Sequence, residues 1–93
     1  MEISGLPGAP LVEEGIADLA RRTESVASLL VSIGAPRLRL LGFDLSEPFS
    51  APEERLYALL AREGIDSAHG RYNALVRTLV SFERAAALRR RAA

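Results

Sequence analysis

Apolar residues recur at intervals of three and four along most of this chain, a pattern typical of amphipathic helices. The segments with this spacing run from Pro10 to about Arg22, from Thr23 to Gly34, from Ser50 to Gly64 and from Asp66 to about Leu88. No stretch of strand length alternates apolar and polar residues. The pattern predicts an all-α fold, a small bundle of four helices plus a short helical turn, with antiparallel neighbours because the connections are short.

The end of the second helix is predicted from a glycine and a proline. Thr23 is a suitable N-cap for this helix, and Gly34 is a suitable left-handed residue to end it. Pro36 then restarts the chain, and Arg37–Leu41 is predicted to form the short helical turn, which Gly42 closes. The sequence therefore predicts a break between the second helix and this turn.

Capping signals also mark the third and fourth helices. Ser50 and Glu53 have the spacing of a capping box, which predicts that the third helix begins there. Gly64 followed by Ile65 is typical of a Schellman ending, in which the apolar residue folds back onto the helix. Asp66 is then predicted to cap the fourth helix.

The remaining segments divide the chain into an arm, one domain and a tail. Residues 1–9 are rich in Gly and Pro and are predicted to form a flexible N-terminal arm. Residues 10–88 form a single helical domain, and residues 89–93 form a frayed basic tail. In the connection between the turn and the third helix, Phe43, Leu45 and Phe49 are expected to plug the core.

Composition excludes several kinds of site. The 93 residues contain no cysteine and one histidine, so neither a disulfide nor a thiolate or multi-histidine metal site can form within one chain. No apolar stretch approaches the about 20 residues of a membrane-spanning helix, and the N-terminus does not resemble a secretory signal. We therefore expect a soluble cytoplasmic protein with no cofactor, no metal and no membrane association.

All twelve basic residues are arginines, which indicates either a binding surface or a GC-rich genome. Residues 1–60 contain nine acidic residues and five arginines, whereas residues 61–93 contain three acidic residues and seven arginines. This asymmetry can steer partners or favour head-to-tail contact between copies. An acidic half that folds back on a basic half would explain it equally well.

The predicted core face of the fourth helix contains a carboxylate, Glu83. A carboxylate that points at a core must be paired or protonated. In one interpretation Glu83 is buried and forms a structural ion pair with Arg37 or Arg39. In the other, the fourth helix extends beyond the bundle and Glu83 lies in water.

A polar row beside that core face is the candidate binding surface. His69, Asn73 and Arg77 follow one another at four-residue steps, and Tyr72 and Arg84 lie beside them. Such a row can bind an anion, a carboxylate or a partner backbone. The alternative interpretation is a solvated helix flank.

No catalytic, metal or nucleotide motif is present, so we assign no catalytic residue. The sequence favours a small non-enzymatic protein–protein interaction module, and we expect a homo-oligomer, with a dimer favoured, because Leu11 and Val31 widen the apolar faces of the first two helices. One alternative is a nucleic-acid-associated regulator that uses Arg71, Arg77, Arg84 and Arg89–Arg91. Another is a small-ligand or anion site on the His69–Asn73–Arg77 row.

Overall fold

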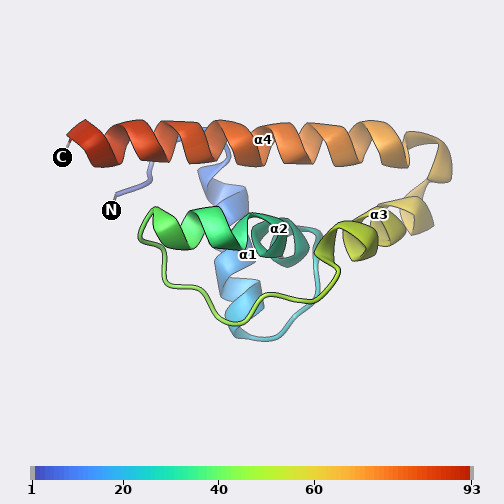
Figure 1. Cartoon of the computed structure of the whole chain (residues 1–93). Coiled ribbons are helices and arrows are strands. Elements are labelled where there is room, and N and C mark those ends of the chain that lie inside the picture. Colours follow the sequence, from blue (N-terminus) through green and yellow to red (C-terminus); the bar gives the residue numbers. More distant parts are fainter. Residues whose placement is uncertain (1, 93) are drawn as a thin grey trace.

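The computed structural model describes residues 2–92 and contains four helices (Figure 1). They are α1 (Ala9–Ala20), α2 (Val26–Leu40), α3 (Pro52–Glu63) and α4 (Ile65–Ala92). This part of the chain contains no strand, so the predicted all-α class is confirmed. Met1 and Ala93, the outermost residues of the predicted arm and tail, lie outside the described residues.

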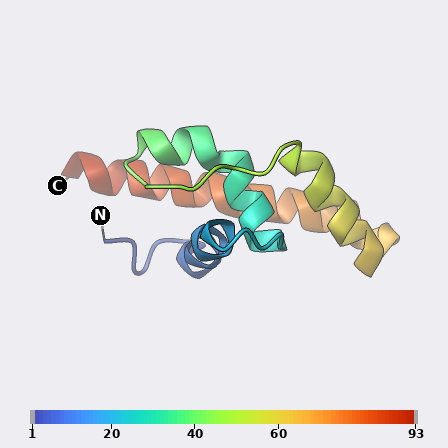
Figure 2. The ribbon, with the colours of Figure 1, turned by 90° about the horizontal axis from the view of Figure 1, so that it is seen from below.

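The long helix α4 determines the shape of the molecule. Its 28 residues span about 42 Å at 1.5 Å per residue, which matches the longest dimension of the 42 × 25 × 18 Å molecule. The other three helices lie on one side of α4 (Figure 1). Helix α2 contacts each of α1, α3 and α4. The chain reverses between α3 and α4, whereas α1 crosses the direction of α4 in both views (Figures 1 and 2).

Helix α2 continues through Gly34 and Pro36, where the sequence predicts a break. Gly34 is buried, and a Cβ atom there would lie 3.0 Å from both Glu83 Oε2 and Leu79 Cδ1. This glycine therefore lies at a close contact between α2 and α4 and does not form a left-handed helix ending. Pro36 removes one helical hydrogen bond, and α2 changes direction along its length (Figure 2). The predicted separate turn, Arg37–Leu41, is the last part of this bent helix.

The N-cap of α2 is Ser25 rather than the predicted Thr23. The Ser25 side chain accepts a hydrogen bond from the Ser28 backbone N–H at 3.1 Å, and the Ser28 hydroxyl accepts one from the Ser25 N–H at 2.8 Å. The Ser25 hydroxyl also donates to the buried carboxylate of Asp18, at 2.8 Å. Arg21 pairs with the other oxygen of Asp18. This network joins α1 to the start of α2 and explains why a carboxylate is buried there.

The predicted capping box at Ser50 and Glu53 does not form. Helix α3 begins with Pro52 at its first position, so its N-cap is Ala51, which has a left-handed backbone (φ 45°) and no capping side chain. Ser50 lies one residue too far from the helix to cap it. Asp66 is likewise not a cap, because it already lies within the first turn of α4.

The two ends of the chain contact each other. Leu6 is buried in the core, and the Arg89 guanidinium donates to the backbone carbonyls of Glu2 and Ser4, at 3.1 Å in each case. Helix α4 continues past its predicted end at Leu88 through the basic run. Within the described residues, the predicted arm and tail thus contact one another, and their flexibility stays a prediction.

Phe82 of α4 is the largest fully buried side chain, with 0% of its surface exposed. Phe43 packs against it with ring centroids 5.7 Å apart, Leu45 is buried, and Phe49 is partly buried. The Phe49 backbone N–H donates to the buried Ser32 hydroxyl at 3.1 Å, which fastens the connection to α2. The prediction that this segment plugs the core is confirmed. The remaining large, fully buried hydrophobic side chains are Val12, Leu19, Leu29, Leu30, Val31, Leu38, Leu56 and Leu60.

Candidate functional site

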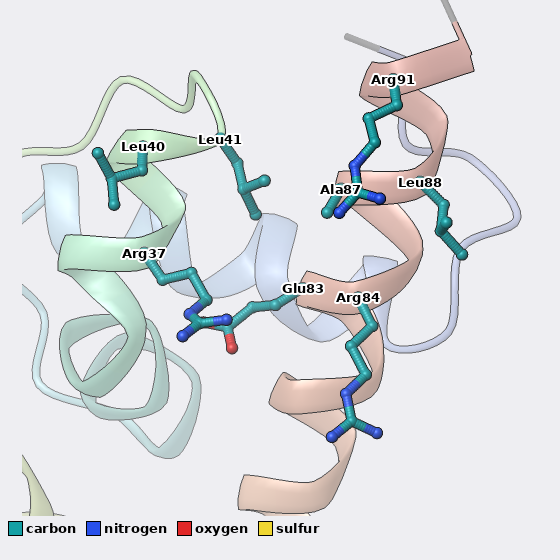
Figure 3. Close-up of a pocket in the computed structure, with 8 residues that line it drawn as sticks. All are labelled: Arg37, Leu40, Leu41, Glu83, Arg84, Ala87, Leu88 and Arg91. Carbon is teal, nitrogen blue, oxygen red and sulfur yellow. The ribbon is translucent and has the colours of Figure 1, made fainter.

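A groove of about 540 Å³ lies between the C-terminal parts of α2 and α4 (Figure 3). We call it the α2–α4 groove. Four apolar and four charged residues line it: Leu40, Leu41, Ala87, Leu88, Arg37, Glu83, Arg84 and Arg91. The groove exists because the bent end of α2, which the sequence predicts to be a separate turn, meets the C-terminal part of α4.

Two leucines of this groove are largely exposed to solvent. Leu40 has 81% of its surface exposed and Leu88 has 64%. A single exposed leucine is ordinary on a small protein. Two in one groove, beside the partly buried Leu41, form a local apolar surface that water covers unfavourably.

Most arginines of the described residues bind elsewhere in the protein. Two exposed pairs are Arg55 with Glu24 at 3.1 Å and Arg71 with Glu63 at 2.9 Å, and Arg21 pairs with a buried acid. Others donate to backbone carbonyl oxygens: Arg22 to Glu47, Arg39 to Leu45 and Ser46, Arg89 to Glu2 and Ser4, and Arg90 to Leu40. These contacts give most of the arginine content a structural role.

Five arginines make no hydrogen bond or ion pair within residues 2–92: Arg37, Arg62, Arg77, Arg84 and Arg91. Three of them, Arg37, Arg84 and Arg91, line the α2–α4 groove. An arginine presents a planar fork of donors that suits a carboxylate or a phosphate. The groove therefore gathers donors that the rest of the described chain does not use.

Glu83 lies in the wall of this groove with 8% of its surface exposed. Its side chain and that of Arg37 point toward each other (Figure 3), although the described residues include no salt bridge between them. Arg39 instead donates to the carbonyls of Leu45 and Ser46, at 3.4 and 3.3 Å. Of the two arginines predicted to pair with Glu83, the structure brings only Arg37 near it.

Burial raises the pKa of the Glu83 carboxyl, and the nearby charge of Arg37 offsets part of the rise. A carboxyl with a higher pKa in the folded state binds protons more tightly there. The folded protein therefore loses stability as the pH rises above 4.5, the ordinary value for this group. At neutral pH the charged form of Glu83 is thus a destabilising feature, retained at the wall of the groove.

We expect Glu83→Gln to be more stable than the native protein at about pH 7, with the difference vanishing toward about pH 4, where the carboxyl is protonated in both states. Urea unfolding across this range measures the difference. Glu14→Gln, at an exposed position of α1, is the matched control and should follow the native protein. A constant difference between native protein and Glu83→Gln at every pH would contradict this interpretation.

The predicted His69–Asn73–Arg77 row is only partly assembled. His69 Nε2 lies 3.2 Å from Asn73 Nδ2, so these two side chains meet on the exposed flank of α4. Arg77 makes no hydrogen bond to either of them within the described residues. It lines a separate recess beside residues 7–8. The row thus does not converge on one cavity.

Tyr72 and Arg84, which the sequence places beside the row, lie in two different parts of the structure. Tyr72 packs against Tyr57 of α3 with ring centroids 5.9 Å apart, and burial raises the pKa of Tyr72. Arg84 lines the α2–α4 groove. Of the predicted binding residues, the structure therefore assigns only Arg84 to this groove.

Sequence reasoning missed the groove's apolar residues, and it considered Arg91 only within a basic run that could contact nucleic acid. It placed a helix end at Gly34, so Arg37, Leu40 and Leu41 were not considered as one face of a helix that reaches α4. The available signal was local: Arg37, Leu40 and Leu41 share a helical face once the helix continues through Pro36.

Within residues 2–92, no three metal-ligating side chains gather in one place. None of the helices in that range joins enough length to enough apolar character to cross a membrane. No protein-family model, curated protein or solved structure matches this chain, so the chemistry of the groove has to carry the functional argument.

Proposed function

We propose that this chain is a small non-enzymatic helical module that binds another protein at the α2–α4 groove. The observation that carries the proposal is the convergence of Arg37, Arg84 and Arg91 on a groove with two exposed leucines. Protein interfaces combine an apolar centre with a polar rim, and arginine is enriched in them. A partner that covers Leu40 and Leu88 would exclude water and give the arginines their missing acceptors.

Nucleic-acid binding is supported less well. That alternative uses Arg71, Arg77, Arg84 and Arg89–Arg91, but Arg71 pairs with Glu63, while Arg89 and Arg90 hold backbone carbonyls. The small-ligand alternative is weakened as well, because the His69–Asn73–Arg77 row does not enclose a common cavity.

Self-association stays a prediction, but the surface expected to mediate it changes from the first two helices to the α2–α4 groove. Val31, which the sequence suggests for a dimer surface, is fully buried against α1 and the core, and Leu11 is partly buried. The wide apolar faces of the first two helices are therefore largely used within one chain. Four large hydrophobic side chains are exposed in the described residues, and two of them, Leu40 and Leu88, line the α2–α4 groove, where we place the contact with a second copy.

Site-specific photocrosslinking tests the proposal in the cells that make the protein. We expect p-benzoylphenylalanine at position 88 to yield a discrete crosslinked protein species. The same residue at the exposed position of Ala58 on α3 should yield none. Adding Arg84→Gln should deplete the crosslink at position 88, because the partner loses a charged contact.

A product with the mass of two chains would identify the partner as a second copy. Crosslinks of equal yield at positions 58 and 88 would contradict the proposal. So would adducts formed only with nucleic acid or lipid.

A further inference from the structure

Two of the three arginines of the α2–α4 groove are spaced along one helix, α4. Arg84 and Arg91 lie seven residues apart in α4, which is two helical turns or about 10.5 Å. Ala87 and Leu88 lie between them along α4, with Ala87 on the side toward α2 and Leu88 pointing away from α2 (Figure 3). This part of α4 therefore presents positive charge, an apolar surface and positive charge again, in that order.

The opposite wall is the end of α2, which contributes Arg37, Leu40 and Leu41. A groove between two helices has the shape that a third helix fills, because side-chain ridges of one helix pack into the grooves of its neighbours. A helix also satisfies its own backbone hydrogen bonds, so it can cover Leu40 and Leu88 without burying free amide groups.

We propose that the groove binds an amphipathic helix of a different protein, one that carries two carboxylates two turns apart with leucine-like residues between them on the same face. The proposal rests on the groove being the protein-binding surface. The two carboxylates meet Arg84 and Arg91, where charge-assisted hydrogen bonds form. The leucine-like residues pack against Leu40 and Leu88.

The charges of the groove residues determine where the partner helix can place its acidic residues. Glu83 and Arg37 point toward each other, so the negative charge of one offsets the positive charge of the other. Arg84 and Arg91 form no ion pair with Glu83, the single acid among the groove residues, or with any other acid within residues 2–92. A helix with acids at its two ends and apolar residues at its centre fits this distribution, whereas a uniformly acidic segment would approach Glu83.

The occupant is a different protein because this chain lacks the pattern. None of α1, α2, α3 and α4 carries two acidic residues seven positions apart. A second copy of the chain therefore has no helix that could present carboxylates to Arg84 and Arg91 together.

Fluorescence anisotropy with the full chain and synthetic stapled helical peptides tests this. The spaced peptide is built from alanine, glutamine and leucine, with glutamates at i and i+7 and leucines at i+3 and i+4. The shifted peptide has the same composition, with the second glutamate moved to i+9 on the opposite face. We expect the spaced peptide to bind about tenfold more tightly, equivalent to about 1.4 kcal/mol.

Variants of the protein provide the second comparison. Arg84→Gln and Arg91→Gln should each weaken binding of the spaced peptide by about tenfold and leave the shifted peptide less affected. Arg77→Gln, which removes an equally unpaired arginine outside the groove, should leave both affinities unchanged. All three positions are exposed, and circular dichroism checks that each variant keeps its helix content.

Equal binding of the two peptides, lowered equally by both groove variants, would overturn the carboxylate spacing and leave the groove as a protein-binding surface. Absence of binding by the spaced peptide would overturn the inference, and photocrosslinking at position 88 would then decide the proposed function separately. Tighter binding of a single-stranded RNA oligonucleotide, lost in Arg84→Gln, would overturn the inference in favour of nucleic acid.

Discussion

Replacing Phe82 with alanine is expected to lower the free energy of unfolding by about 4 kcal/mol. The ring is 0% exposed and packs against Phe43 from the connection between α2 and α3. Its removal takes away buried apolar surface and leaves a cavity, because the surrounding leucines belong to several helices and cannot all move inward. Small domains have only about 5–15 kcal/mol of stability, so this loss is a large fraction of the total.

Thermal and urea unfolding of Phe82→Ala measure this effect, with an expected fall in the melting temperature of about 20 °C. Leu88→Ala is the matched control, because it shortens an exposed apolar side chain on the same helix. It should change stability by less than about 0.5 kcal/mol. A loss below about 1 kcal/mol in Phe82→Ala would show that the core is not centred on this ring.

Replacing Gly15 with alanine is expected to destabilise the protein by about 2–3 kcal/mol, although alanine normally favours helix. Gly15 is buried in α1, and a Cβ atom there would lie 2.9 Å from the Ala27 carbonyl carbon and overlap Val31 Cγ2. The obstacle is partly backbone, so no side-chain rotation relieves it. Helix α1 would have to move away from α2 and open their shared core.

Gly70→Ala distinguishes this packing effect from helix propensity. Gly70 lies in α4, is exposed, and has nothing within 4 Å of an added Cβ atom. Its replacement should stabilise the protein by about 0.5–1 kcal/mol. Changes of the same sign in both variants, measured by urea unfolding, would show that close approach of α1 and α2 does not require glycine.

Helix periodicity sufficed to predict the helical class because its signal is local. The spacing of apolar residues predicted helices over most of α1, α3 and α4, and the burial of Leu45 followed from an apolar residue placed in a short connection. Local signals gave the wrong answer at Gly34. That glycine accommodates Leu79 and Glu83, which are remote in sequence, and nothing beside Gly34 indicates them.

The candidate site was less predictable for the same reason. The burial of Glu83 agrees with its place on the helical face, and the contact between His69 and Asn73 follows from their four-residue spacing. The groove instead depends on which part of α2 reaches α4. Leu40 and Leu88 resemble core residues in the sequence, and only the fold shows that they are exposed.

The arginines that hold backbone carbonyls have an evolutionary consequence. Arg22, Arg39, Arg89 and Arg90 each bind an oxygen that any amino acid would supply. Substitution at the acceptor position therefore leaves the contact intact, whereas substitution of the arginine removes it. Among homologues, we expect each of these arginines to be invariant while the residue that supplies the carbonyl oxygen varies. Methods that infer contacts from correlated substitutions would miss these arginine–carbonyl hydrogen bonds. The same bonds hold the connection before α3 and residues 2–4 in place.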